Sequence, residues 1–145
     1  MLGAESVKTH GYDPEKLVML AIEARKNAYV PYSKFHVGAA LVADNGKVYT
    51  GCNVENASYG AAICAERTAI VKAISDGAKK ILAFAVSSDS NGATMPCGIC
   101  RQVISEFASP ETPLYLSNYN GSFETWRFDE LLPSAFKQSD MEDVK

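Results

Sequence analysis

The spacing of hydrophobic residues predicts a helix followed by a β-hairpin in the first third of the chain. Asp13 and Pro14 suit the start of a helix, as a capping side chain followed by a proline in the first turn. After them, apolar residues recur at helical spacing, which predicts a helix over residues 14–28. Two apolar, β-branched stretches, residues 37–43 and 47–54, flank an Asp-Asn-Gly turn and therefore predict a β-hairpin.

The remaining pattern alternates helices with strands. Helical spacing predicts helices over residues 64–75 and 98–107. Residues 81–86 are continuously apolar, as expected of a central strand covered on both faces. Shorter strands are expected over 114–116 and 123–128, before a short C-terminal helix. The order αββαβαββ predicts an α/β fold, a three-layer αβα sandwich around a mixed five-stranded sheet.

Chain length favours a single domain over residues 1–145, with flexible tails at about 1–12 and 137–145. A chain of 145 residues suits one hydrophobic core. A domain of this size buries enough surface to fold without a disulfide or a structural metal. Any metal site in this chain therefore needs a functional reason.

The charge pattern argues against nucleic acid as a partner. The formal net charge is −3, whereas binding a phosphate backbone requires clustered Lys and Arg. Of the two basic doublets, Arg25-Lys26 is expected at the solvated end of a helix and Lys79-Lys80 in a connection from helix to strand.

No sequence feature indicates a membrane or secretion. No apolar run approaches the roughly 18 residues of a membrane helix, and no signal-peptide pattern is found at the N-terminus. We therefore expect a cytoplasmic protein, or one that is also nuclear. In a reducing compartment, four cysteines indicate metal binding or catalysis more often than disulfides.

Three of the cysteines are expected at helix starts. Cys64 begins one predicted helix, and Cys97 and Cys100 begin the next. Helix N-termini stabilise negative charge, so they favour the thiolate form that binds zinc. Three protein ligands leave the fourth zinc position open, as in catalytic sites, whereas structural sites are closed by four.

Two alternatives to a three-thiolate site remain. Cys52 could be a fourth ligand, but it falls within a predicted strand and outside any CxxC pair, which favours a buried free thiol. Cys97 and Cys100 could form a redox pair, but this would leave Cys64 and Glu66 without a role.

A family resemblance supports the catalytic reading. The chain carries a CAE element, then PCGIC after roughly thirty residues, which is the all-cysteine variant of the zinc deaminase signature. Further blocks, in the same order as in the family, are FHVGAAL, GCNVENASYG, CAERTAI, PCGICRQ and LLPSAF. Between residues 29 and 136 the chain resembles the homotetrameric cytidine deaminase family.

This resemblance implies a chemistry and a set of site residues. It implies hydrolysis of cytidine and 2′-deoxycytidine to uridine and 2′-deoxyuridine with release of ammonia, a step of pyrimidine salvage. One Zn²⁺ per chain would be held by Cys64, Cys97 and Cys100. Glu66 would move protons, and Arg67 would hydrogen-bond the cysteine ligands and offset their charge.

The resemblance also implies substrate and subunit contacts. Asn53 and Glu55 would bind the sugar hydroxyls, and Glu55 would repel a 5′-phosphate. Phe35, Ala65 and Phe136 would contact the base. A neighbouring subunit of the homotetramer would be reached by Tyr59, Gly60 and Ala61.

Two rival functions remain open. Blasticidin deaminases also join a CAE element to a PCGxC element, although the NVENASYG and LLPSAF blocks favour cytidine. A noncatalytic zinc-binding module would bind the metal without turnover. His10 and His36 have no metal-type spacing and are not expected to be ligands.

Overall fold

The protein is built on a mixed five-stranded sheet. The computed structural model describes residues 12–142, and its strand order is β2-β1-β3-β4-β5. β3 and β4 pair in parallel, whereas the other neighbours are antiparallel. The strands are β1 (Val37–Ala43), β2 (Val48–Cys52), β3 (Ile81–Ser88), β4 (Pro113–Ser117) and β5 (Phe123–Arg127).

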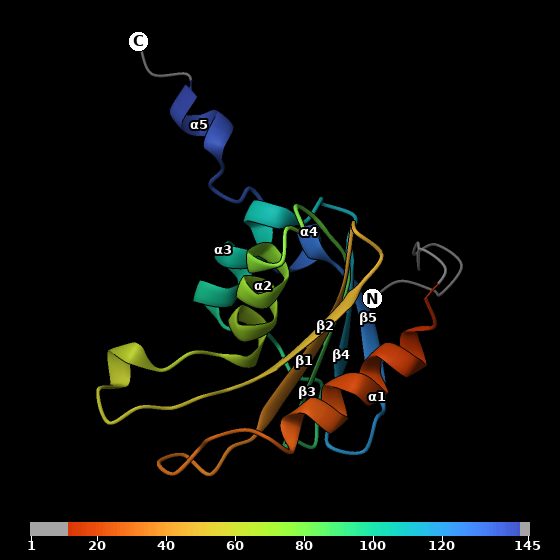
Figure 1. Ribbon diagram of the computed structural model, residues 1–145. Helices are drawn as coiled ribbons and strands as arrows, with labels where there is room; N and C mark the ends of the chain where they lie inside the picture. The colour runs from red at the N-terminus through yellow and green to blue at the C-terminus, as the bar shows by residue number, and fades with distance from the viewer. Residues whose placement is uncertain (1–11, 143–145) are drawn as a thin grey trace.

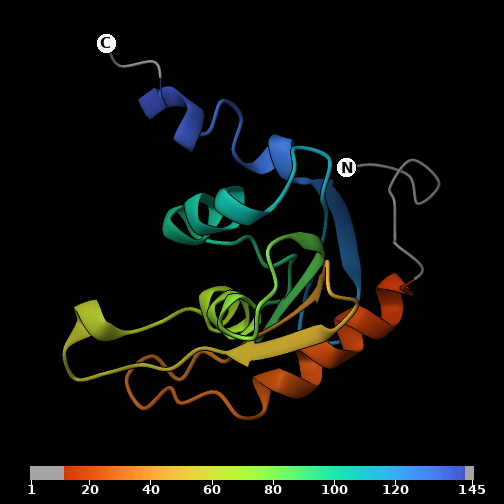
Figure 2. The ribbon, with the colours of Figure 1, turned by 45° about the horizontal axis from the view of Figure 1, so that its top comes forward.

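Helices cover both faces of this sheet, which confirms the three-layer prediction. α1 (Pro14–Arg25) lies on one face, and α2 (Ala65–Ser75) and α3 (Gly98–Phe107) lie on the other (Figures 1 and 2). Each face has its own buried cluster. One contains Leu17, Val18 and Tyr115, and the larger one contains Ile70, Phe84 and Ile104.

Two glycines let the helices approach the sheet closely. A Cβ atom at Gly38 would lie 1.9 Å from the carbonyl oxygen of Ala21 in α1. A Cβ atom at Gly51 would lie 2.5 Å from the backbone nitrogen of Ala69 in α2. Both distances are far below van der Waals contact, so these positions require glycine. The glycines of the FHVGAAL and GCNVEN blocks therefore fix how α1 and α2 lie on the sheet.

α1 is shorter than predicted, and one of the two basic residues at its end is largely buried. The backbone N–H groups of Lys26, Asn27 and Ala28 each bond to the carbonyl three residues earlier, a tighter turn that ends the α-helix at Arg25. The Arg25 side chain is only 17% exposed. It donates to Ser87 Oγ, Ser88 O and Tyr119 O, because the serine-rich end of β3 lies against this helix. The prediction of a solvated doublet was therefore wrong for Arg25, whereas the Lys26 side chain is 67% exposed, as expected.

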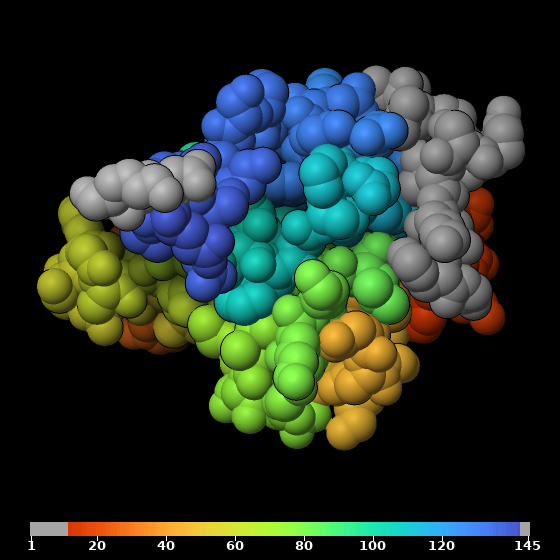
Figure 3. All heavy atoms as spheres, turned by 90° about the horizontal axis from the view of Figure 1, so that it is seen from above, coloured from red at the N-terminus to blue at the C-terminus, as the bar shows by residue number. Residues whose placement is uncertain are grey.

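β2 also ends earlier than predicted, at Cys52, and the chain then extends away from the body of the domain. Val54 forms an isolated bridge with Ile63, and between them lies the short helix η2 (Tyr59–Ala61). This segment and the residues 29–36 project from the same side of the molecule (Figures 1 and 2). The segment around η2 also stands out in the space-filling view (Figure 3).

The C-terminal part contains two short helices where one was predicted. β5 ends at Arg127, and α4 (Phe128–Leu131) follows at once. α5 (Gln138–Glu142) forms within the region expected to be a flexible tail, and none of its residues is buried. The expected tail at residues 1–12 and the end of the chain, 143–145, lie outside the described residues, except for Tyr12. No helix within residues 12–142 has both the length and the apolar character needed to cross a membrane.

Candidate metal and catalytic site

The structure brings together the three cysteines that the sequence predicts as ligands. Cys64 lies at the N-cap of α2 and Cys97 at the N-cap of α3, while Cys100 is buried in the first turn of α3. Their sulfur atoms all lie within 4.8 Å of one another. The cluster forms because the N-terminal ends of two adjacent helices meet beside the sheet.

The spacing and chemistry of these sulfurs fit zinc. Zn–S bonds of about 2.3 Å in a tetrahedron place neighbouring sulfurs about 3.8 Å apart. The Sγ atoms of Cys64 and Cys97 are 3.8 Å apart. Within the described residues this is the only group of three or more Cys, His, Asp or Glu side chains close enough to share an ion. Zn²⁺ is therefore the cofactor of this site.

The thiols of the cluster influence one another's protonation. A hydrogen bond from the Cys100 thiol, together with Arg67, holds the pKa of Cys64 well below its usual value, although burial acts in the opposite direction. The same bond to Cys64, together with burial, raises the pKa of Cys100. The cluster is thus poised to hold a thiolate, and metal binding requires that its thiols lose their protons.

Glu66 places a buried carboxyl group beside the cysteines. It follows Ala65 in the first turn of α2, and its exposed fraction is 4%. Burial raises the pKa of Glu66 to about 7, with the Cys64 charge adding to the rise and its own backbone N–H and Arg67 opposing it. A carboxyl group with a pKa near neutrality can both accept and donate protons.

Arg67 lies against the same cluster from the next position of α2. Its Nη2 atom donates to Cys64 Sγ at 3.7 Å. Its Nε atom is buried without a hydrogen-bond partner in the described part of the chain. Three thiolates on Zn²⁺ carry a net charge of −1, so this guanidinium complements the charge of the loaded site.

A second group of predicted residues lies at the projecting loops. The Asn53 side chain accepts from Val37 N at 2.9 Å and donates to Phe35 O at 2.8 Å. Glu55 Oε1 accepts from Tyr32 N at 3.0 Å. Phe35 itself is 42% exposed, which is unusual for a core phenylalanine. The structure thus links Asn53 directly to Phe35, whereas Glu55 bonds to the preceding part of the same loop, at Tyr32 and Ser33.

Phe136 and the η2 residues are exposed in the single chain. Phe136 is 59% exposed and lines a hollow between α3 and α4, with its carbonyl accepting from Gln102 Nε2. Tyr59 is 78% exposed and packs edge-on against Tyr32. Gly60 and Ala61 are also exposed, so the other described residues of the chain cover this short helix little.

The cysteine and histidine outside the cluster behave largely as predicted. Cys52 is a free thiol outside the sulfur cluster, although it is only partly buried. His36 is partly exposed and pairs through Nδ1 with Asp89 at 2.8 Å. His10 lies outside the described residues.

Sequence reasoning gave no role to Arg101, which contacts the surroundings of the site. Its Nε donates to Pro96 O at 2.8 Å, next to Cys97, and its Nη1 donates to Leu131 O at 2.7 Å. Arg101 thereby ties the ligand loop to the segment that carries Phe136. The PCGICRQ block contains this arginine, but its two carbonyl partners are not visible in any sequence pattern.

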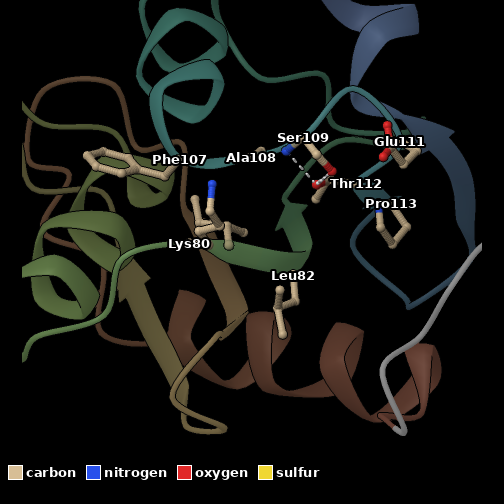
Figure 4. Close-up of a pocket in the computed structure, with 9 residues that line it drawn as sticks. Lys80, Leu82, Phe107, Ala108, Ser109, Glu111, Thr112 and Pro113 are labelled. Atoms are coloured by element: carbon tan, nitrogen blue, oxygen red, sulfur yellow. Dashed lines mark hydrogen bonds between the residues drawn. The ribbon is translucent and has the colours of Figure 1, made fainter.

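A separate hollow lies at the opposite end of α3. It has a volume of about 230 Å³ and is lined by Lys80, Leu82, Phe107 and Glu111 among others (Figure 4). These residues surround the amino ends of β3 and β4, far along α3 from Cys97. Its lining contains no cysteine or histidine, so the reactive groups are concentrated at the other end of the helix.

Fold and site together define an α/β protein with a three-thiolate zinc centre and an adjacent buried carboxyl group. The chain belongs to the cytidine and deoxycytidylate deaminase family, whose zinc-binding region matches residues 12–116. A cytidine deaminase of Sporosarcina psychrophila is 51% identical over 129 residues, which are 89% of this chain and 95% of that protein. One of Halalkalibacterium halodurans is 49% identical and covers 90% of this chain and 99% of its own length.

Solved structures agree with this assignment. A cytidine deaminase from Burkholderia pseudomallei superposes with a TM-score of 0.82 and 46% identity, covering 86% of this chain and all of that one. That of Mycobacterium tuberculosis gives a TM-score of 0.73 and 42% identity, over 86% of this chain and 98% of that one. These neighbours confirm the predicted α/β sandwich.

Proposed function

We propose that the protein catalyses the hydrolytic deamination of cytidine and 2′-deoxycytidine, giving uridine or 2′-deoxyuridine and ammonia. The observation that carries the proposal is the cluster of Cys64, Cys97 and Cys100 with the Glu66 carboxyl buried beside it. Relatives of up to 51% identity over nearly their whole length bear the name cytidine deaminase.

Three cysteine ligands suit catalysis rather than a purely structural metal. A zinc ion with three protein ligands keeps a position for water and lowers the pKa of that water toward neutrality. Cys64, Cys97 and Cys100 would hold the ion, and Cys52 would remain outside the site. Arg67 would stabilise the thiolates through its bond to Cys64 Sγ.

Glu66 would carry the protons. Its carboxylate would take the proton of the water that attacks C4 of the pyrimidine and deliver it to N3. It would then transfer the remaining proton of the added C4 hydroxyl group to the exocyclic amino group, which leaves as ammonia as the C4 carbonyl forms. Because Glu66 and Cys64 lie in the same helical turn, the position of the Glu66 carboxylate relative to the zinc ligand Cys64 is fixed.

Asn53 and Glu55 would bind the sugar, and Phe35, Ala65 and Phe136 would contact the base. A negative carboxylate near the sugar would disfavour a 5′-phosphate, so we expect nucleosides to be preferred over nucleotides. The exposure of Phe35 supports its role, because an aromatic ring left open to solvent is available to a ligand.

The wider assignment is a single domain over residues 1–145 that assembles as a homotetramer and acts in cytoplasmic pyrimidine salvage. The exposed side chains of Tyr59 and Phe136 support the assembly, since a neighbouring subunit would cover them. Tyr59, Gly60 and Ala61 would then contact the site of the neighbour.

Ammonia release from a panel of substrates tests the proposed function. The purified zinc-loaded protein would be incubated separately with cytidine, 2′-deoxycytidine, cytosine, CMP and blasticidin. We expect turnover of both nucleosides and little turnover of the other three. Preference for blasticidin would assign the chain to the rival deaminases, and bound zinc without turnover of either nucleoside would indicate a noncatalytic module.

Replacing Arg67 by Ala is expected to weaken zinc binding or lower kcat/KM by about tenfold to a hundredfold while the fold is retained. The reason is that Cys64 Sγ would lose its cationic donor. Metal analysis, cytidine kinetics and far-UV circular dichroism would be measured together. Arg127→Ala, which removes an arginine paired with Asp129 rather than with a cysteine of the cluster, is the control. Unchanged zinc content and kinetics in Arg67→Ala would reject this role.

A further inference from the structure

The loop that presents Phe35 is held by the segment after β2. Tyr29 N donates to Asn53 O at 3.0 Å, and Glu55 N donates to Tyr29 O at 2.8 Å. At the other end of the loop, Asn53 N donates to Val37 O at 3.2 Å. Hydrogen bonds therefore join the two segments that carry the proposed base and sugar contacts into one unit.

Ser33 lies at the centre of this unit. Its hydroxyl group donates to Glu55 Oε2 and accepts from the backbone N–H of Phe35 at 3.0 Å. Its own backbone N–H donates to Glu55 Oε1 at 3.1 Å. The Ser33 side chain thus connects Glu55, the proposed sugar contact, to Phe35, the proposed base contact.

The backbone next to Ser33 adopts a conformation that needs support. Lys34 has a φ angle of 61°, in the left-handed region that residues other than glycine disfavour. Lys34 N bonds to Val30 O at 3.0 Å, which closes the turn. Strained backbone persists only where its surroundings fix it, and it is concentrated at functional sites. Ser33 precedes Lys34, and its hydroxyl group accepts from the N–H of Phe35, the residue after Lys34. This bond supplies part of that support.

The charge of Glu55 agrees with this arrangement. The Ser33 hydroxyl and backbone N–H, followed by the N–H of Tyr32, hold the pKa of Glu55 below its usual range, against the opposing effect of burial. Glu55 therefore stays ionised at neutral pH. A charged acceptor strengthens the hydrogen bond that Ser33 donates.

We propose that Ser33 is a positioning residue of the nucleoside site, whose hydroxyl group fixes Glu55 and Phe35 relative to each other for binding the sugar and the base. This inference rests on the proposed function and adds to it a residue outside the predicted site. Ser33 acts through Glu55 and Phe35, so its loss affects binding of the nucleoside rather than the proton transfers of Glu66.

Steady-state kinetics of Ser33→Ala with cytidine test the proposal. We expect KM to rise about tenfold to a hundredfold, as for the loss of a hydrogen bond to a charged group, while kcat stays within about twofold. Ser33→Thr keeps a hydroxyl group and is expected to restore most of the affinity. Ser75→Ala removes an exposed serine at the end of α2 and should leave KM unchanged.

A double-mutant cycle with Glu55→Ala separates positioning from general loss of structure. Since Ser33 acts partly through Glu55, Ser33→Ala should raise KM by a smaller factor in the Glu55→Ala background than in the wild type, and the remaining factor reports its bond to the Phe35 N–H. Binding of uridine, measured by calorimetry, should weaken in parallel with the rise in KM.

The two proposals fail in different ways. A wild-type protein that neither deaminates cytidine nor binds uridine would overturn the proposed function and, with it, the role of Ser33. An active wild type with an unchanged KM in Ser33→Ala, a fall in kcat alone, or no recovery in Ser33→Thr would overturn only the inference about Ser33.

Discussion

Replacing Glu66 by Gln is expected to lower kcat for cytidine by about 10²- to 10⁴-fold, the range that general acid–base catalysis contributes. Glutamine has nearly the same shape but cannot take up or release the proton. The buried position next to Cys64 should therefore remain filled, and zinc should remain at one per chain. Cytidine kinetics and metal analysis on the same preparation measure both effects.

The matched control for this variant is Glu106→Gln, which makes the same chemical change at an exposed position of α3. Its kcat should equal that of the wild type. If Glu66→Gln lost zinc, Glu66 would be part of the metal site rather than the proton carrier. A decrease in kcat of less than about tenfold would remove Glu66 from the chemistry altogether.

The second large effect is expected at the cysteines. Alanine at Cys64, Cys97 or Cys100 should each abolish tight zinc binding and reduce turnover to background, because two thiolates and water cannot replace the three-ligand set. The chain should still fold, since a domain of about 150 residues does not need a metal to build its core. Metal content, cytidine turnover and far-UV circular dichroism of each variant test this.

Cys52→Ala provides the matched control within the same chain. Cys52 is at the end of β2 and outside the sulfur cluster, so this variant should keep both zinc and activity. Loss of zinc in Cys52→Ala as complete as in Cys64→Ala would mean a site closed by four thiolates. A closed site would leave no position for water, and the proposed mechanism would fail.

The sequence predicted the sheet and the main helices because local patterns determine them. α3 begins and ends where the apolar spacing places it, at Gly98 and Phe107. The three cysteines were recognisable because the CAE and PCGIC elements carry them at the starts of predicted helices, where the thiolate form is favoured. α1 ends earlier than predicted because residues 26–28 form a tighter turn, and Arg25 at its end bonds to β3 more than sixty residues away.

The finer parts of the site depend on non-local contacts and were not predictable. Ser33 bonds to Glu55 across 22 positions, and Arg101 bonds to Leu131 across 30. No periodicity or motif encodes such pairs. The left-handed Lys34 was equally hidden, because lysine carries no preference for that conformation. The sequence therefore indicated the reactive groups but not the bonds that position their neighbours.

The most direct test is a single reaction of the wild-type protein, with zinc content and products determined on one sample. Zinc at one per chain, together with equal amounts of uridine and ammonia formed from cytidine, is the predicted result. Folded protein that holds zinc but forms no uridine from cytidine would contradict the assignment of a zinc-dependent cytidine deaminase.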